Sequence, residues 1–245
     1  MGCALALLET VAVYRHPEAR ERLPAGILWT VVFAGGARML RGVSLGGAGA
    51  GALCCLLIVT GGGAAGFSAL GMVFVLTWTA TRLAGTGKEA RERSASQVFA
   101  NLGIAAAAIA WSPGHPWLLA GGLAALCEAA TDTVASETGK AFSPRAWMIT
   151  TGRPVAAGAN GGISLVGTGW GIVAGSGVAV TYFVVALGGL PGRPLPMAVV
   201  AGAAGMLVDS VLGATLENRG WLDNDAVNFL GTLSAGVLGI ILARF

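Results

Sequence analysis

Carboxylates stand inside an apolar stretch of this chain, where they are energetically costly. Residues 116–140 read PWLLAGGLAALCEAATDTVASETGK; the first half is typical of a membrane helix, and the second half carries Glu128, Asp132 and Glu137. Glu128, Asp132 and Ser136 are four residues apart and therefore share one face of a helix. Each carboxylate within a span costs about 2.5–3.5 kcal/mol on insertion scales. The pattern favours a divalent-metal or proton site over an internal polar contact that only fixes helix packing.

A second apolar stretch repeats this arrangement. Residues 201–218 place Asp209, Gly213 and Glu217 on one helix face, and the next segment, WLDNDAVNFL, opens another apolar stretch. Capping of that next helix explains one polar residue at its start. It does not explain four polar groups in six positions, which are Asp223, Asn224, Asp225 and Asn228. The segment therefore also favours a site.

A long glycine-rich loop, residues 151–169, lies between these two stretches. Its glycines allow backbone amides to converge on an anion, and the helix expected to follow it favours negative charge at its N-terminus. Basic side chains can add countercharge. The residues concerned are Gly158, Gly161, Gly162, Lys140 and Arg153. Small-residue helix packing is the alternative for the glycines at 161, 162, 167, 169 and 171.

Carboxylates, a glycine-rich loop and basic side chains together fit phosphoryl transfer. Mg²⁺ or Mn²⁺ would be held by one or two carboxylates and by nucleotide phosphates, and catalysis would rest on positioning and charge neutralisation. The catalytic and metal candidates are Asp132, Asp209 and Asp225. The phosphate-binding candidates are Ser136, Lys140, Arg153, Asn160, Gly161, Gly162, Ser164, Asn224 and Asn228. The supporting polar candidates are Gln97, Asn101, Glu137 and Glu217.

The elements that must position these residues are predicted to be membrane helices. Of the 245 residues, 55% are hydrophobic and 11% are charged, and the mean hydropathy is +0.74. Soluble domains carry about 25% charged residues, so the composition excludes an ordinary soluble domain. The small net charge of +3 gives no reason to expect a nucleic-acid partner.

An all-α, polytopic transmembrane helix bundle of about eight or nine spans is expected, as a single membrane domain over residues 1–245. A span needs roughly 20 apolar residues. The predicted spans are 23–40, 44–61, 64–84, 97–112, 116–136, 162–188, 196–215 and 226–243, with a shorter apolar piece at 2–14. Clear turns are GGG at 61–63, SPGHP at 112–116 and GGLPGRPLP at 188–196.

These spans place the loops 38–43, 85–96, 137–161 and 216–225 on one face. That face collects most basic loop residues, which are Arg38, Arg41, Lys88, Arg91, Arg93, Lys140, Arg145, Arg153 and Arg219. The positive-inside rule makes it cytoplasmic. The polar candidates gather there too, with Asp209 deeper in its span, so we expect one polar site that opens to the cytoplasm. The basic loop 85–96 by itself is typical of an ordinary positive-inside loop.

Five ordered blocks resemble the transmembrane protein 19 family, which includes the phytyl-phosphate kinases of plants and cyanobacteria. They are QVFANLGIAA (97–106), TDTVASETG (131–139), TGRPVAAGANGGISLVGT (151–168), DSVLGATLE (209–217) and NDAVNFL (224–230). They lie in the motif-bearing part, 97–245, whereas residues 1–96 match only as a hydrophobic pattern. DTVASETGK also resembles, more loosely, a block of CTP-dependent dolichol kinases and membrane cytidylyltransferases.

This resemblance implies an integral membrane kinase that converts an isoprenoid monophosphate to the diphosphate. A nucleoside triphosphate is the donor, and CTP is the expected one. The site residues that fall in matching motifs are Asp132, Ser136, Glu137, Asn160, Gly161, Gly162, Ser164, Asp209, Asn224, Asp225 and Asn228. The chain departs from the family at Val134, Ala157, Ala159 and Glu217. The hydroxyl missing at Ala159 and the charge added at Glu217 are the two changes that bear on donor or acceptor preference.

Two other functions remain open on the sequence. A membrane cytidylyltransferase that makes a CDP-lipid would use the same metal and nucleotide. A transporter or channel would use intramembrane Asp132 and Asp209 to bind ions or protons. A structural scaffold explains charges in lipid poorly. The expected partners are the lipid bilayer, an isoprenoid phosphate and a nucleotide, and a homo-oligomer is left open.

Overall fold

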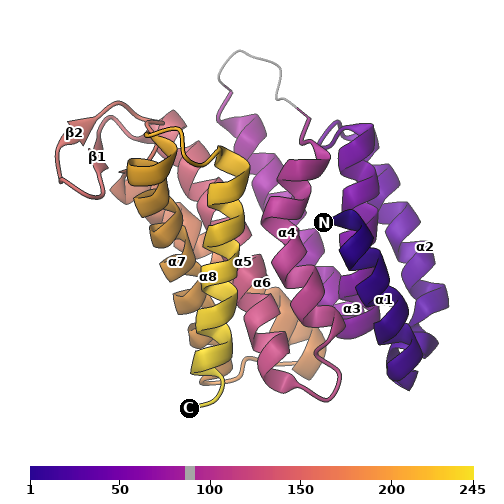
Figure 1. Ribbon diagram of the computed structural model, residues 1–245. Coiled ribbons are helices and arrows are strands. Elements are labelled where there is room, and N and C mark those ends of the chain that lie inside the picture. Colours follow the sequence, from indigo (N-terminus) through magenta and orange to yellow (C-terminus); the bar gives the residue numbers. More distant parts are fainter. Residues whose placement is uncertain (86–91) are drawn as a thin grey trace.

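The computed structural model describes residues 1–85 and 92–245, which form a bundle of α-helices (Figure 1). Over these residues the all-helical membrane fold is confirmed, and five of the helices are long and apolar enough to cross a membrane. The predicted loop residues Lys88 and Arg91 lie outside the described residues. The helices are α1 Gly2–Arg15, α2 Pro17–Met39, α3 Leu45–Leu83, α4 Ala95–Ala110, α5 Pro116–Phe142, α6 Leu165–Leu187, α7 Pro194–Leu212 and α8 Asn224–Leu242.

The long helix α3 is two antiparallel halves joined at Gly63. This glycine has φ 60° and ψ −152°, which is not helical and which glycine adopts without a Cβ penalty. Both ends of α3 lie at the same end of the bundle. Arg82 near its C-terminus donates to the Leu40 carbonyl at 3.0 Å, and Val43 just before its start forms a β-bridge with Arg93. The turn predicted at 61–63 is therefore where the chain reverses.

Helix α5 extends further than predicted. It ends at Phe142 instead of 136, so Glu137 and Lys140 lie on a helix and not in a loop. No proline interrupts the segment from Glu137 to Phe142, and the single Gly139 is tolerated within the helix. Ser143 precedes Pro144 and has extended backbone dihedrals. A residue before proline is disfavoured in the helical region, which explains why the helix ends there.

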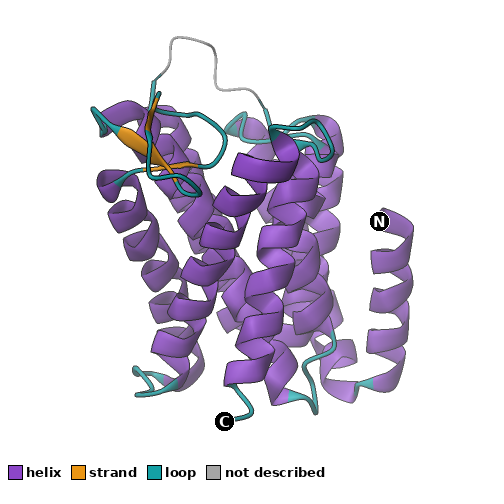
Figure 2. Cartoon of the chain, turned by 60° about the vertical axis from the view of Figure 1, so that its left-hand side comes forward, coloured by secondary structure: helices purple, strands orange, loops and turns teal. Residues whose placement is uncertain are grey.

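A small antiparallel sheet lies within the segment from 137 to 169 that was predicted as loop and helix start. Its strands are β1 Ala146–Met148, β2 Pro154–Val155 and β3 Gly162–Ile163, in the order β2-β1-β3. Strands of two or three residues leave no periodicity to detect in a sequence. The sheet lies at the same end of the bundle as the N-terminus of α4, and the C-terminus of the chain lies at the opposite end (Figures 1 and 2).

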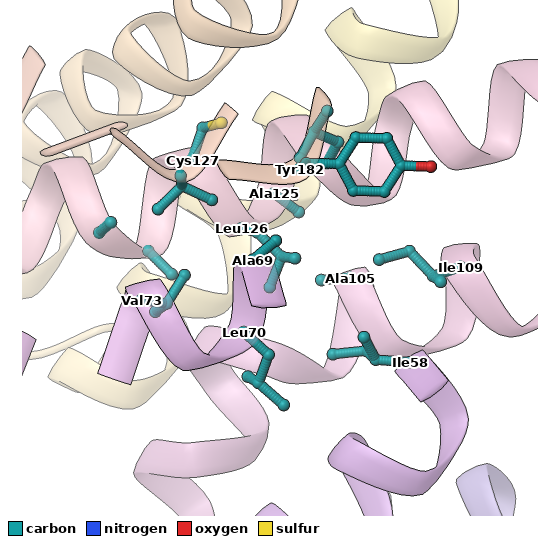
Figure 3. Packing of buried hydrophobic residues seen from close by; sticks show 14 of the residues in the cluster. Ile58, Ala69, Leu70, Val73, Ala105, Ile109, Ala125, Leu126, Cys127 and Tyr182 are labelled. Atoms are coloured by element: carbon teal, nitrogen blue, oxygen red, sulfur yellow. The ribbon is translucent and has the colours of Figure 1, made fainter. Parts of the chain in front are cut away.

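Helix α5 is the centre of the bundle. It packs against α3, α4, α6, α7 and α8, and its residues from 121 to 131 are buried. On one side it contributes Leu126 to an apolar core with Ile58, Leu70 and Ile109 (Figure 3). The central position of α5 brings its carboxylates close to several helices at once.

Candidate active site

A polar pocket of about 820 Å³ is lined by α5, the 157–164 loop, α7, the π-helical turn η1 (Gly213–Glu217) and α8. The structure brings most of the predicted site residues together here. They are Asp132, Ser136, Lys140, Asn160, Gly161, Gly162, Ser164, Asp209, Glu217, Asn224 and Asn228. Residues from four separated parts of the chain therefore line one pocket.

The wall formed by α5 follows from helical spacing. Asp132, Ser136 and Lys140 are four residues apart and all line the pocket. Glu137 does not line it, and its Oε1 lies 3.7 Å from Lys140 Nζ in a partly exposed ion pair. Because the helix continues to Phe142, it holds the Lys140 ammonium group on the same face as Asp132.

The glycine-rich loop forms the opposite wall. Gly158 and Gly161 have φ of 86° and 75°, values that side chains other than glycine rarely adopt. The loop packs tightly, because a Cβ on Gly161 would stand 2.4 Å from the Ala214 Cβ in the π turn. The Gly162 amide donates to the Ala159 carbonyl at 2.9 Å, so this predicted anion donor is already used inside the turn.

Helix α6 begins directly behind this loop. Ser164 is its N-cap and accepts a hydrogen bond from the Gly167 amide at 3.0 Å. The N-terminus of a 23-residue helix therefore lies next to the pocket and favours an anion there. The role of Ser164 is thus partly structural.

The glycines that follow serve helix packing. A Cβ on Gly171 would lie 2.6 Å from the Thr131 carbonyl, and a Cβ on Gly167 would lie 2.4 Å from the Ala135 carbonyl. Both therefore allow α6 to approach α5 closely, as small residues do between membrane helices. Gly169 has no atom within 4 Å of its Cβ position. The two interpretations left open by the sequence thus apply to different glycines.

Two buried carboxylate oxygens have no hydrogen-bond partner among the described residues. They are Glu128 Oε1 and Asp209 Oδ2. Both lie beside Gly231 on α8, where a Cβ would stand 2.7 Å from the first and 3.4 Å from the second. An unpaired carboxylate in a low-dielectric interior is costly, so this arrangement calls for a proton or a cation.

The carboxylates of the pocket are too few to enclose a metal ion by themselves. Within residues 1–85 and 92–245, no three His, Cys, Asp or Glu side chains are grouped to hold a metal. Mg²⁺, however, is commonly held by only one or two protein carboxylates together with substrate phosphates. Asp132 and Asp209 both line the pocket and can serve in this way.

Several predicted residues lie elsewhere. Asp225 is in the first turn of α8 and does not line the pocket, and Arg153 is exposed in the loop between β1 and β2. Gln97 completes the capping box of α4, and Asn101 donates to the Gln97 carbonyl at 2.9 Å. Asp223 caps α8 by accepting from the Ala226 amide at 2.8 Å.

Arg93 was predicted only as part of a positive-inside loop, but it lies near the acidic residues. Its guanidinium group is partly buried and interacts electrostatically with Glu137 and Asp132. Burial lowers the pKa of Arg93, and these two carboxylates oppose that shift. The sequence feature that could have singled out Arg93 is its position directly before Ser94, the N-cap of α4, because the start of a helix holds the neighbouring backbone in place.

The comparisons identify the family. The model of the family described as integral membrane protein DUF92 matches residues 28–236. An uncharacterized membrane protein of Synechocystis is 36% identical over 141 residues, which are 56% of this chain and 54% of that protein. The chloroplastic protein VTE6 of Arabidopsis thaliana is 30% identical over 132 residues, which are 51% of this chain and 38% of that protein.

Another relative, the protein PGR of Arabidopsis thaliana, is 30% identical over 148 residues, which are 46% of this chain and 51% of that protein. The chain thus spans about half the length, or less, of these curated relatives. No solved structure matches. The family match covers the helices that build the pocket and all five sequence blocks that carried the resemblance. The chain belongs to the integral membrane protein family DUF92.

Proposed function

We propose that the protein is a membrane phosphotransferase that converts an isoprenoid monophosphate to its diphosphate, with a nucleoside triphosphate, expected to be CTP, as donor. One observation carries this proposal. Asp132, Asp209, Lys140, a glycine-rich loop and a helix N-terminus converge on one polar pocket at the end of an otherwise apolar bundle. The family resemblance of the same sequence blocks supports the isoprenoid acceptor. The relative VTE6 matches over about half of the chain.

The reaction needs little covalent help from the protein. An oxygen of the acceptor phosphate attacks the γ-phosphorus of the donor, a new P–O bond forms, and the bond to the β–γ bridging oxygen breaks. The products are the isoprenoid diphosphate and a nucleoside diphosphate. The acceptor oxygen is already anionic near neutral pH, so no histidine base is required, and catalysis rests on positioning and charge neutralisation.

The described residues have separable roles in this proposal. Lys140 and the amides of Gly158, Asn160 and Gly161 bind donor phosphates, whereas the Ala159 amide already donates to the Ala156 carbonyl at 3.1 Å. Ser136, Asn224 and Asn228 orient the phosphates. Asp132 and Asp209 would hold Mg²⁺ or Mn²⁺, which supplies charge neutralisation when bound. Glu217 lines the same pocket.

Product identification tests the proposal. The purified protein in lipid nanodiscs would be incubated with CTP or ATP, Mg²⁺ and a panel of isoprenyl monophosphates, and the products identified by mass spectrometry. Diphosphate lipid plus nucleoside diphosphate is the expected outcome. CDP-lipid plus pyrophosphate would identify a cytidylyltransferase instead. No product with any donor, together with proton-coupled solute flux in liposomes, would show that the protein is a transporter.

A further inference from the structure

A second pocket, of about 850 Å³, lies between α2, α3 and α4. Most of its wall is apolar, with Phe33, Leu70, Val73, Phe74, Val98 and Leu102. The pocket shares no lining residue with the polar pocket and is not used by the reaction described above.

The charged residues that line this pocket are three arginines. Arg41, Arg82 and Arg93 line it, and none of its lining residues in the described chain is acidic. All three lie near the α2–α3 turn or the start of α4, at the end of the bundle that carries the polar pocket. An apolar interior with a cationic mouth complements an amphiphile that has one anionic head.

The backbone holds two of these arginines firmly. The Arg93 amide donates to the Gly42 carbonyl at 3.2 Å, and the Arg93 carbonyl accepts from the Ser44 amide at 3.0 Å. Gly47 makes this approach feasible, because a Cβ there would stand 2.2 Å from the Arg93 carbonyl oxygen. Arg82 donates to the Leu40 carbonyl at 3.0 Å and lies 5.3 Å from the Trp78 ring centroid.

Arg93 lines the apolar pocket and lies close enough to the acidic wall of the polar pocket to interact with it electrostatically. Its electrostatic partners are Asp132, which lines the polar pocket, and Glu137, which is paired with Lys140. In the part of the chain that the structure describes, its guanidinium group has no hydrogen bond or ion pair within contact distance. Ala129 lines the apolar pocket and Asp132, three residues later on α5, lines the polar pocket, so the two pockets reach α5 within one helical turn of each other.

We propose that the apolar pocket receives the hydrocarbon chain of an isoprenoid monophosphate, with its phosphate held by Arg93 and assisted by Arg41 and Arg82. This inference rests on the proposed function and adds the acceptor site to it. A phosphate monoester carries a charge of about −1.5 to −2 near neutral pH, which several guanidinium groups complement. Arg93 then presents the phosphate to the donor in the neighbouring polar pocket, and acts as a positioning residue.

Filling the pocket is the sharpest test. Gly51 lines it and has no atom within 4 Å of its Cβ position, so Gly51→Leu adds a side chain to the cavity without a backbone clash. Gly49 lies two residues away, is equally uncrowded and does not line the pocket, so Gly49→Leu is the matched control. The probe is geranylgeranyl monophosphate, with binding to the intact protein in nanodiscs and turnover both measured.

Gly51→Leu is expected to weaken binding of the probe about tenfold or more and to raise its KM, with the KM for the nucleotide unchanged. Arg93→Gln is expected to weaken binding of geranylgeranyl monophosphate about tenfold. Binding of geranylgeraniol, which has no phosphate, should be unchanged. Arg93→Lys should restore part of the lost affinity. Equal binding by the two glycine variants, or a change only in the nucleotide KM, would overturn the acceptor site.

Competition identifies the source of the phosphate ligand. If phosphatidic acid displaces the labelled probe as effectively as unlabelled probe does, the pocket binds a diacyl lipid and the isoprenoid assignment is overturned. If inorganic phosphate competes equally well, the apolar pocket contributes nothing to binding.

The proposed acceptor pocket and the proposed kinase activity can fail separately. If Gly51→Leu loses probe binding but the unaltered protein shows no turnover, the acceptor pocket is supported and the kinase is not. If the protein turns over and neither Gly51→Leu nor Arg93→Gln changes the turnover, the kinase is supported and the acceptor pocket is not.

Discussion

Glu128 and Gly231 are in direct contact across the α5–α8 interface. A Cβ on Gly231 would stand 2.7 Å from Glu128 Oε1 and 3.2 Å from the Asp209 Cβ. Glycine at this position therefore leaves the space in which carboxyl groups from α5 and α7 approach each other. The fully buried Glu128 lies one helical turn before Asp132, so this contact supports the floor of the polar pocket.

Gly231→Ala is expected to destabilise the protein and to lower its activity. The added methyl group overpacks a closely packed site, which typically costs about 1–3 kcal/mol, and it displaces carboxyl groups next to Asp209. Thermal unfolding in detergent and turnover are the measurements. Gly71→Ala on α3 is the control, because no atom lies within 4 Å of its Cβ position. Equal melting temperatures for both variants would contradict the contact.

Asp132→Asn and Asp209→Asn should each reduce kcat by about 100-fold or more, since loss of a charge-stabilising group in an active site commonly has an effect of this size. The change is nearly isosteric, so the fold should persist, as checked by size-exclusion chromatography and circular dichroism. Glu21→Gln makes the same chemical change at an exposed position on α2 and should leave turnover unchanged. Full activity of both Asp variants would remove the metal-site proposal.

Lys140→Ala is expected to raise the KM for the nucleotide about tenfold, because one charge-assisted hydrogen bond to a phosphate is lost. The KM for the isoprenyl monophosphate should change less. Arg145→Ala removes an exposed positive charge just beyond α5 and serves as the comparison. If the two variants shift the nucleotide KM equally, Lys140 acts only through the general positive potential of this end of the bundle.

Metal removal should affect turnover but not the fold. The described residues contain no three-donor cluster, so we expect the protein to be stable after EDTA treatment, with turnover lost and then restored by added Mg²⁺. Metal analysis of the purified protein and its melting temperature with and without EDTA are the checks. A tightly bound metal that survives dialysis, or a large fall in melting temperature with EDTA, would indicate a structural ion instead.

Gly171→Ala tests the close packing of α6 on α5. Its Cβ would lie 2.6 Å from the Thr131 carbonyl, so the helices must separate, and about 1–3 kcal/mol of stability should be lost. Gly169→Ala, on the same helix with open space around it, should be neutral or slightly stabilising, because alanine favours helix more than glycine does. Thermal unfolding of the two variants side by side decides the matter, and equal losses would contradict the packing role.

Much of the candidate site could be predicted from sequence because helical spacing is a local property. Asp132, Ser136 and Lys140 share one face of α5 however that helix packs, because they are four residues apart. Every second loop between successive spans lies at the same end of the bundle, which brings the polar segments together. Asp225 shows the limit of this argument. Its spacing relative to Asn228 is suitable, but the rotation of α8 about its axis, which depends on packing against α5 and α7, leaves it outside the pocket lining.

The sequence by itself determined that the chain is a helical membrane protein and which helix faces carry its polar groups, because the cost of charge in lipid and the helical repeat act within single segments. Only the tertiary structure decided that Arg93 lines the apolar pocket and lies near Asp132 of the polar pocket. It also decided that Glu128 meets Gly231, and that Gly161 shapes a loop whereas Gly171 packs helices. These relationships join residues far apart in the chain, and they depend on how closely the helices approach one another, which no single segment specifies.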